Sequence, residues 1–175
     1  MARLLIILLL LRGALAAEGL PTEGTKRMGE LLARIQREAN PLNNPFLNRA
    51  RAEIMAARVA EARNAGRTPH AMVNLHAQYG MELLDAGRSA EAIIQLEAAL
   101  AIHRSPGSAH FMGNRDSSAL RKSLVMAHLR LGEQENCVSN HTTLSCIIPI
   151  DKSATHQFQR GSRGAIKVLL EQLSE

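Results

Sequence analysis

The sequence predicts an all-α protein whose central part is an antiparallel helical hairpin at residues 73–103. Apolar side chains recur with helical period on either side of Asp85-Ala86-Gly87-Arg88. Gly87 can adopt the left-handed conformation that ends a helix, and Ser89 can cap the helix that follows. Aromatic residues make up only 2% of a chain that is 46% hydrophobic. Such a composition favours closely packed helices over a sheet, because strands are enriched in aromatic and β-branched residues.

The first 17 residues have the features of a secretory signal peptide. Arg3 supplies a positive charge, residues 4–11 supply eight consecutive apolar side chains, and Ala14-Leu15-Ala16 is a small-x-small cleavage site. Eight residues are far fewer than the roughly 20 that cross a bilayer. Arg12 places a charge directly after the apolar run, which leaves an uncleaved signal as an alternative. We therefore expect residues 1–17 to direct export and the mature chain to have no membrane span.

Two helices are predicted between the signal peptide and the hairpin, within residues 18–69. The first covers residues 26–39 and the second covers residues 46–65, each with apolar side chains along one side. In the first helix these side chains are Met28, Leu31, Leu32 and Ile35. Thr68 and Pro69 then have the order typical of a helix start, an N-cap followed by proline in the first turn.

The hairpin resembles a tetratricopeptide repeat (TPR), a motif that places small residues where its two helices touch. The chain matches the small positions with Gly80, Ala92 and Ala99, and a large apolar position with Leu96. Small residues at these spacings let two helix backbones approach closely. His76 replaces the usual aromatic residue and Arg104 replaces the usual proline. The resemblance implies a stack of helical hairpins, an α-solenoid fragment, over residues 70–139.

A second, partial copy of the hairpin follows the connection at residues 104–116. At an offset of 45 residues, Met81 aligns with Met126, Leu84 with Leu129, and Gly87 with Gly132. The helix at residues 117–131 is therefore expected to end at Gly132, and a short second helix to begin near Glu133. That second helix degenerates quickly, because the Asn, Ser and Thr residues after it are poor helix formers. An atypical terminal repeat is expected of a capping unit.

Residues 140–175 are predicted to form a loop and a C-terminal capping helix. Ser162 can cap this helix, which covers residues 163–173. Its apolar positions, expected to point inward, are Ile166, Leu169, Leu170 and Leu173.

The order of residues near the C-terminus carries a second resemblance. It consists of Glu135-Asn136-Cys137, His141, Cys146, Pro149-Ile150, His156 and Gly161-Ser162-Arg163-x-Ala165-Ile166. This order is similar to the C-terminal part of secreted bacterial TPR proteins found with ASPIC/UnbV-type repeat proteins. The resemblance implies an exported protein of the bacterial periplasm or the extracellular space. It also implies that the partner is another exported protein or peptide, for example one of β-propeller type, and it implies no reaction.

The set of Cys137, His141, Cys146 and His156 admits three interpretations. A disulfide between Cys137 and Cys146 that pins the C-terminal cap is favoured, because exported chains meet oxidising conditions and this chain has only two cysteines. The alternative is a protein that handles metal or haem with all four side chains, although the later spacings match no standard zinc module. A nucleophilic cysteine needs a lowered thiol pKa, which no feature of the sequence supports.

The sequence predicts an interaction module, and neither an enzyme nor a cofactor-binding protein. It contains no glycine-rich phosphate loop, paired catalytic carboxylates or Ser–His–Asp pattern. The net charge of +5 comes without a dense basic run, so we expect no nucleic-acid partner. The concave face of a helical-repeat stack can hold a peptide or a neighbouring protein. The partner-binding residues expected there are Asn74, Gln78, Arg121 and Val125.

Overall fold

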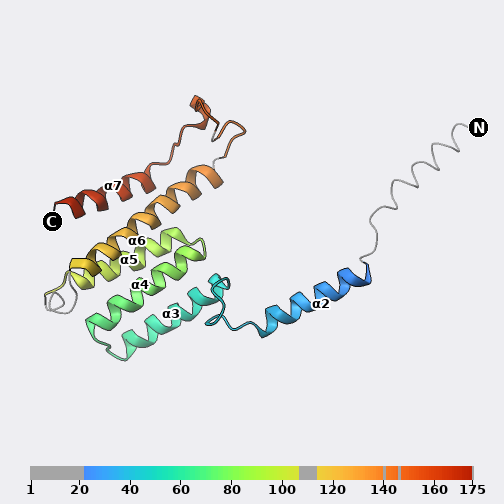
Figure 1. The fold of residues 1–175 in the computed structure, drawn as a ribbon. Coiled ribbons are helices and arrows are strands. Elements are labelled where there is room, and N and C mark those ends of the chain that lie inside the picture. Colours follow the sequence, from blue (N-terminus) through green and yellow to red (C-terminus); the bar gives the residue numbers. More distant parts are fainter. Residues whose placement is uncertain (1–21, 107–113, 140, 146, 175) are drawn as a thin grey trace, which may run out of the picture. The chain divides into compact units, whose positions relative to one another are not determined.

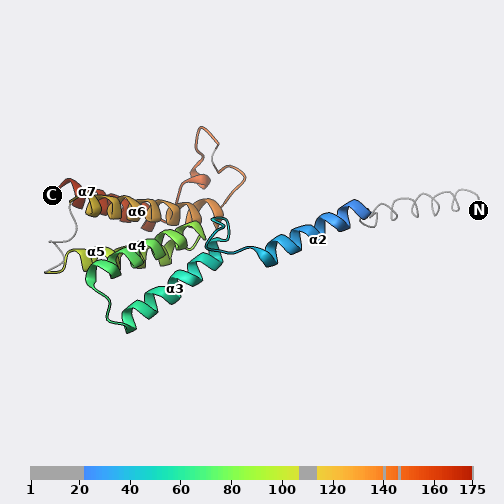
Figure 2. The ribbon, with the colours of Figure 1, turned by 60° about the horizontal axis from the view of Figure 1, so that its bottom comes forward.

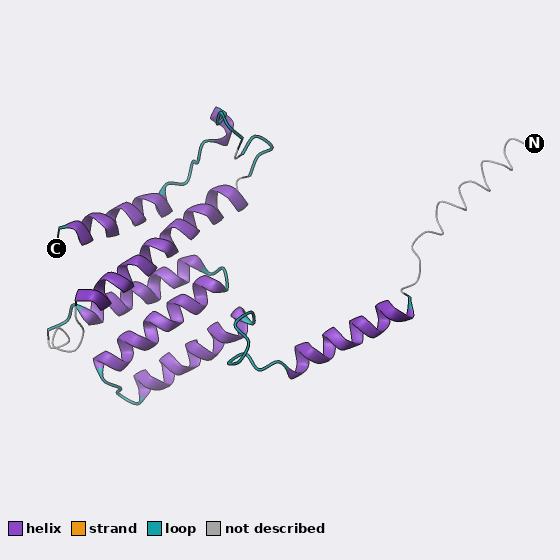
Figure 3. Ribbon diagram, viewed as in Figure 1, coloured by secondary structure: helices purple, strands orange, loops and turns teal. Residues whose placement is uncertain are grey.

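The computed structural model describes residues 22–106, 114–139, 141–145 and 147–174, with the backbone alone at 114–116. The predicted signal peptide and Cys146 lie outside these residues. The chain divides into two units, Met1–Asn44 and Pro45–Glu175. The described residues form helices and loops without a strand, which confirms the predicted all-α class (Figure 3). Among them, no helix combines the length and the apolar character that a membrane span requires.

Helix α2 (Glu23–Glu38) belongs to the first unit and agrees with the helix predicted at residues 26–39. Thr22 caps it, because its hydroxyl oxygen accepts a hydrogen bond from the Thr25 N–H at 3.3 Å. The predicted apolar side is present, but none of the helix's side chains is buried.

The second unit is a stack of antiparallel helices. It contains α3 (Asn48–Asn64), α4 (Pro69–Asp85), α5 (Ser89–His103), α6 (Asn114–Glu133) and α7 (Arg160–Leu173). From α4 onward, each helix packs against the one before it in the chain and runs in the opposite direction (Figures 1 and 2). A π-helical turn, η1 (Gln134–Val138), continues α6, and a short 3₁₀ turn, η2 (Lys152–Ala154), lies in the loop before α7.

The predicted hairpin is formed by α4 and α5. Thr68 accepts a hydrogen bond from the Ala71 N–H at 3.3 Å and Pro69 begins α4, as predicted. Gly87 has a φ of +74°, so the turn uses the left-handed conformation that glycine adopts without strain. The predicted cap by Ser89 is wrong. Arg88 occupies the N-cap position, and Ser89 is the first helical residue, with a buried hydroxyl that makes no hydrogen bond.

Small residues bring α4 and α5 into close contact at the predicted positions. Ala92, Leu96 and Ala99 are fully buried in the core. A Cβ atom added to Gly80 would lie 2.7 Å from Cγ of Leu96 and 3.3 Å from the carbonyl oxygen of Ala92. The absence of a side chain at Gly80 therefore sets the distance between the two helices.

The turn predicted at Gly132 is wrong. Helix α6 continues through Gly132 to Glu133 and then into η1, so no short second helix begins there. Gly132 instead lies where α7 packs: a Cβ atom on Gly161 would lie 2.5 Å from the backbone nitrogen of Gly132. Gly161 is the glycine that this close approach requires, since a Cβ atom on Gly132 would meet its nearest neighbours at 3.8 Å.

The buried side of α7 also differs from the prediction. The residues expected to point inward are 46–83% exposed, namely Ile166, Leu169, Leu170 and Leu173. The buried positions are Gly161, Ala165 and Val168. Helix α7 packs with its small residues because they allow the α6 backbone to approach within contact distance.

Replacing Gly80 by alanine is expected to destabilise the second unit by about 1–3 kcal/mol, because the new methyl group overlaps Leu96 in a packed core. Denaturant unfolding followed by circular dichroism measures the change. Gly132→Ala is the matched control, since its Cβ atom would meet its nearest neighbours at 3.8 Å, an ordinary contact. Equal unfolding midpoints for the two variants would contradict this account of the α4–α5 contact.

Candidate functional site

A buried amide joins the end of α6 to the start of α7. Asn136 lies in η1, and its Nδ2 donates a hydrogen bond to the carbonyl oxygen of Phe158 at 2.8 Å. Its Oδ1 accepts one from the Phe158 N–H at 3.0 Å. The same Nδ2 also donates to the carbonyl oxygen of Gly132 at 2.9 Å. One side chain therefore satisfies both backbone groups of Phe158, two residues before α7 begins.

The residues on either side of Asn136 contact the same segment. Glu135 forms an ion pair with Arg160, and the Cys137 sulfur lies 3.6 Å from Nε2 of His156. Three consecutive residues thus contact residues 160, 158 and 156 in turn. Glu135, Asn136 and Cys137 therefore contact the segment before α7 in reverse chain order.

The predicted disulfide is not confirmed, because Cys137 carries a free thiol and Cys146 lies outside the described residues. Of the alternative metal ligands, Cys137 and His156 are neighbours, while His141 is exposed. Within the described part of the chain, no group of three or more His, Cys, Asp or Glu side chains is placed to hold a metal ion. The noncovalent contacts of residues 135–137 pin the C-terminal part in this structure.

A groove lies between α4 and α6, and we call it the α4–α6 groove. Its cavity volume is about 680 Å³. Its apolar lining consists of Met81, Leu84, Met126 and Val138, and its charged residues are Asp85, Lys122, Arg130 and Glu133. At one end, Gln134 donates a hydrogen bond from Nε2 to the carbonyl oxygen of Gly87 at 2.6 Å. This bond fixes η1 against the α4–α5 turn, so the end of the groove has a defined shape.

The predicted partner-binding residues lie on the two helices that form this groove, but at other positions. Asn74 and Gln78 are exposed on α4 and do not line it. Arg121 is 4% exposed and does not line the groove, and Val125 packs against the core. Their neighbours along α6 line the groove instead, because a shift of one residue turns a helical side chain by about 100°.

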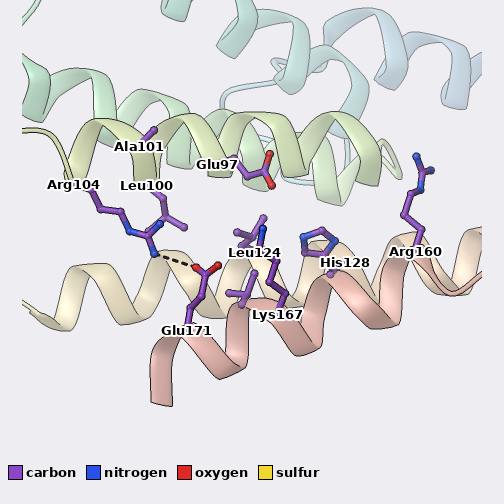
Figure 4. A pocket seen from close by; sticks show the side chains of 11 residues that line it. Glu97, Leu100, Ala101, Arg104, Leu124, His128, Arg160, Lys167 and Glu171 are labelled. Carbon is purple, nitrogen blue, oxygen red and sulfur yellow. Dashed lines mark hydrogen bonds and ion pairs between the residues drawn. The ribbon is translucent and has the colours of Figure 1, made fainter. Parts of the chain in front are cut away.

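A second groove lies across α6 between α5 and α7, and we call it the α5–α7 groove. Its volume is about 380 Å³. Leu100, Ala101, Leu124 and Val168 provide apolar surface, and Glu97, Arg104, His128, Arg160, Lys167 and Glu171 provide polar groups. In Figure 4, Glu97, Lys167 and His128 lie close together in the view, and the ion pair of Arg104 and Glu171 at 3.2 Å lies toward one end. Arg160 extends away from them at the other end.

His128 is the half-buried polar group of the α5–α7 groove. Its ring packs on the α7 backbone, since a Cβ atom on Gly164 would lie 2.3 Å from Nδ1. Nδ1 is buried and makes no hydrogen bond. Burial lowers the pKa of His128; Glu97 opposes this shift, and the positive charges of Arg160 and Lys167 add to it. We infer that the ring is neutral near pH 7 and carries its proton on Nε2, because a proton on Nδ1 would lack an acceptor.

Sequence reasoning missed the α5–α7 groove because it assigned the last helix a purely capping role. A usable signal was present. Gly161 and Gly164 lie one helical turn apart, and small residues at this spacing allow the backbone of another helix to come close. That signal predicts where α7 packs, although it does not name the charged side chains that meet around His128.

Comparisons of the chain with protein-family models, with curated proteins and with solved structures gave no match.

Replacing Asn136 by alanine is expected to leave the Phe158 N–H and carbonyl groups without partners and to cost about 1–3 kcal/mol. Hydrogen exchange at the Phe158 amide should accelerate more than exchange in α4. Ser139→Ala, an exposed position just after η1, is the control. Unchanged exchange at Phe158 in Asn136→Ala would show that the amide does not hold this segment.

Stability is expected to fall as the pH decreases below about 6.5, the ordinary histidine pKa. The lowered pKa of His128 means that the unfolded chain binds this proton more readily than the folded one. The contribution of neutral His128 to the free energy of unfolding is therefore present above the pKa that this residue has in the unfolded chain. It is lost as the pH falls toward the pKa that the residue has in the folded protein. Nuclear magnetic resonance of the His128 ring should give a pKa below 6.5. Unfolding of His128→Gln should depend less on pH than unfolding of the exposed-site control His141→Gln.

Proposed function

We propose that this protein is an exported, TPR-like interaction module that binds an apolar peptide segment of another protein in the α4–α6 groove. The observation that carries the proposal is the pair of Met81 and Met126. They align at the 45-residue offset, come from neighbouring antiparallel hairpins, and line the same cavity while 39% and 47% exposed. Exposed apolar side chains that gather in a groove are typical of protein contact sites.

The lining of the groove favours a partner with apolar side chains. Methionine side chains are flexible and polarisable, so they adjust to the shape of an inserted side chain. Leu84 and Val138 extend the apolar surface along the groove. Binding would remove this surface from water, which is the main favourable term in most protein associations.

The charges on the α6 side of the groove favour an acidic group at that edge, while Asp85 provides a negative charge on the α4 side. Arg130 pairs with Glu133 at 2.9 Å, so these two charges neutralise each other. Lys122 is exposed on the α6 side of the groove. A carboxylate on the partner can pair with Lys122, and this pairing would fix the orientation of the segment more than its affinity.

The TPR resemblance and the predicted signal peptide support the same proposal. The small positions of the motif, Gly80, Ala92 and Ala99, are buried between α4 and α5. In this proposal α6 and α7 form the second hairpin, with a long loop between them. A chain exported by residues 1–17 would meet exported partners, and the resemblance to ASPIC/UnbV-associated proteins favours one of β-propeller type.

Site-specific photocrosslinking tests the groove in cells that make the protein. A photoreactive amino acid at Met81 or Met126 is expected to link the chain to one exported protein of defined mass. The same amino acid at Ile94, which is 60% exposed on α5 and lies outside the groove, is the control. Met126→Lys should abolish the adduct formed at position 81 without changing the helical circular dichroism signal.

Crosslinking that is equally strong at position 94, or an adduct that survives Met126→Lys, would contradict the proposed groove. Recovery of the unprocessed chain in the cytoplasm would contradict the exported location.

A further inference from the structure

The α5–α7 groove contains one negative and one positive group that the protein itself leaves unengaged. Glu97 extends from α5 and Lys167 from α7, on opposite sides of the groove (Figure 4). Within the described residues, neither the Glu97 side chain nor the Lys167 side chain takes part in a hydrogen bond or an ion pair. Both charges act on the pKa of His128, so both lie near its ring.

The other charges of the groove are already neutralised. Arg104 pairs with Glu171 at 3.2 Å, and Arg160 pairs with Glu135. The unengaged charges therefore sum to zero, and they come from helices on opposite sides of the groove. A simple anion would pair with Lys167 but face the carboxylate of Glu97, and a simple cation would face the opposite conflict. A zwitterion satisfies both groups, with its ammonium on Glu97 and its carboxylate on Lys167.

His128 adds a hydrogen-bond donor near these charges. Its Nδ1 is buried against Gly164, so Nε2 is the ring nitrogen that a ligand can reach. In the neutral ring Nε2–H donates, and a carboxylate oxygen is a suitable acceptor. A ligand carboxylate beside Lys167 would therefore have a second donor.

The remaining surface fits a short apolar side chain. Leu100, Leu124 and Val168 line the groove together with the charged groups. The volume of about 380 Å³ lies at the small end of the range for small-molecule sites, roughly 300–1,000 Å³. It suits a single amino acid better than a peptide.

We propose that the α5–α7 groove is a binding site for a free amino acid with an apolar side chain. Glu97 binds the ammonium group, Lys167 and Nε2–H of His128 bind the carboxylate, and the leucine and valine side chains contact the side chain of the ligand. This site is separate from the α4–α6 groove, and it adds a small-molecule ligand to a protein-binding module.

Isothermal titration calorimetry of the full chain with three compounds tests the site. L-leucine carries both charges, 3-methylbutylamine lacks the carboxylate, and 4-methylpentanoate lacks the ammonium group. L-leucine is expected to bind about tenfold more tightly than either fragment, because each lost contact is a hydrogen bond to a charged group. Equal affinities for the three compounds, or no binding of L-leucine at about 10 mM by the folded protein, would overturn the proposal.

Two variants assign the roles of the charged groups. Glu97→Gln should reduce the affinity for L-leucine to that for 4-methylpentanoate and leave the affinity for 4-methylpentanoate unchanged or higher. Lys167→Gln should reduce the affinity for L-leucine to the affinity for 3-methylbutylamine. Lys122→Gln, a lysine of the other groove, is the matched control and should bind L-leucine as the natural chain does. Unchanged L-leucine affinity in Glu97→Gln or in Lys167→Gln, with helical circular dichroism preserved, would overturn the proposal.

Discussion

The side-chain amide of Asn136 bonds both backbone groups of Phe158, and the position of α7 depends on this contact. A long loop separates α6 from α7, and a loop of that length does not by itself determine where the next helix packs. The amide fixes the loop two residues before α7 begins, and the ion pair of Glu135 and Arg160 fixes the first residue of the helix. Buried polar contacts of this kind specify one arrangement, because every alternative leaves polar groups unsatisfied.

The π-helical turn η1 orients the Asn136 side chain toward Phe158 in the loop before α7. An extra residue in a helical turn rotates the side chains that follow it relative to an unbroken α-helix. The turn lies directly after α6, so residues 134–137 serve several contacts at once. Gln134 bonds the α4–α5 turn, and Asn136 bonds the segment that leads to α7. One irregular turn therefore links the first hairpin to the last helix.

Helix α6 contributes to both grooves because different sides of it are left partly open. Met126 and Lys122 line the groove shared with α4. Leu124 and His128, on another side, line the groove shared with α5 and α7. The close approach of α7 at Gly161 and Gly164 brings Lys167 near His128 and completes the second groove. A bulkier α7 would stand farther from α6 and would separate the groups that meet there.

The sequence by itself determined the local features of this protein. Helical periodicity identified the helices, and Thr68, Pro69 and Gly87 marked turns whose geometry depends on a few neighbouring residues. Tertiary structure decided which side of each helix is buried. Gly132 has the pattern of a turn but lies within α6, and α7 buries its small residues rather than its leucines. The physical reason is that a turn is a local conformation, whereas packing depends on how closely two distant backbones can approach.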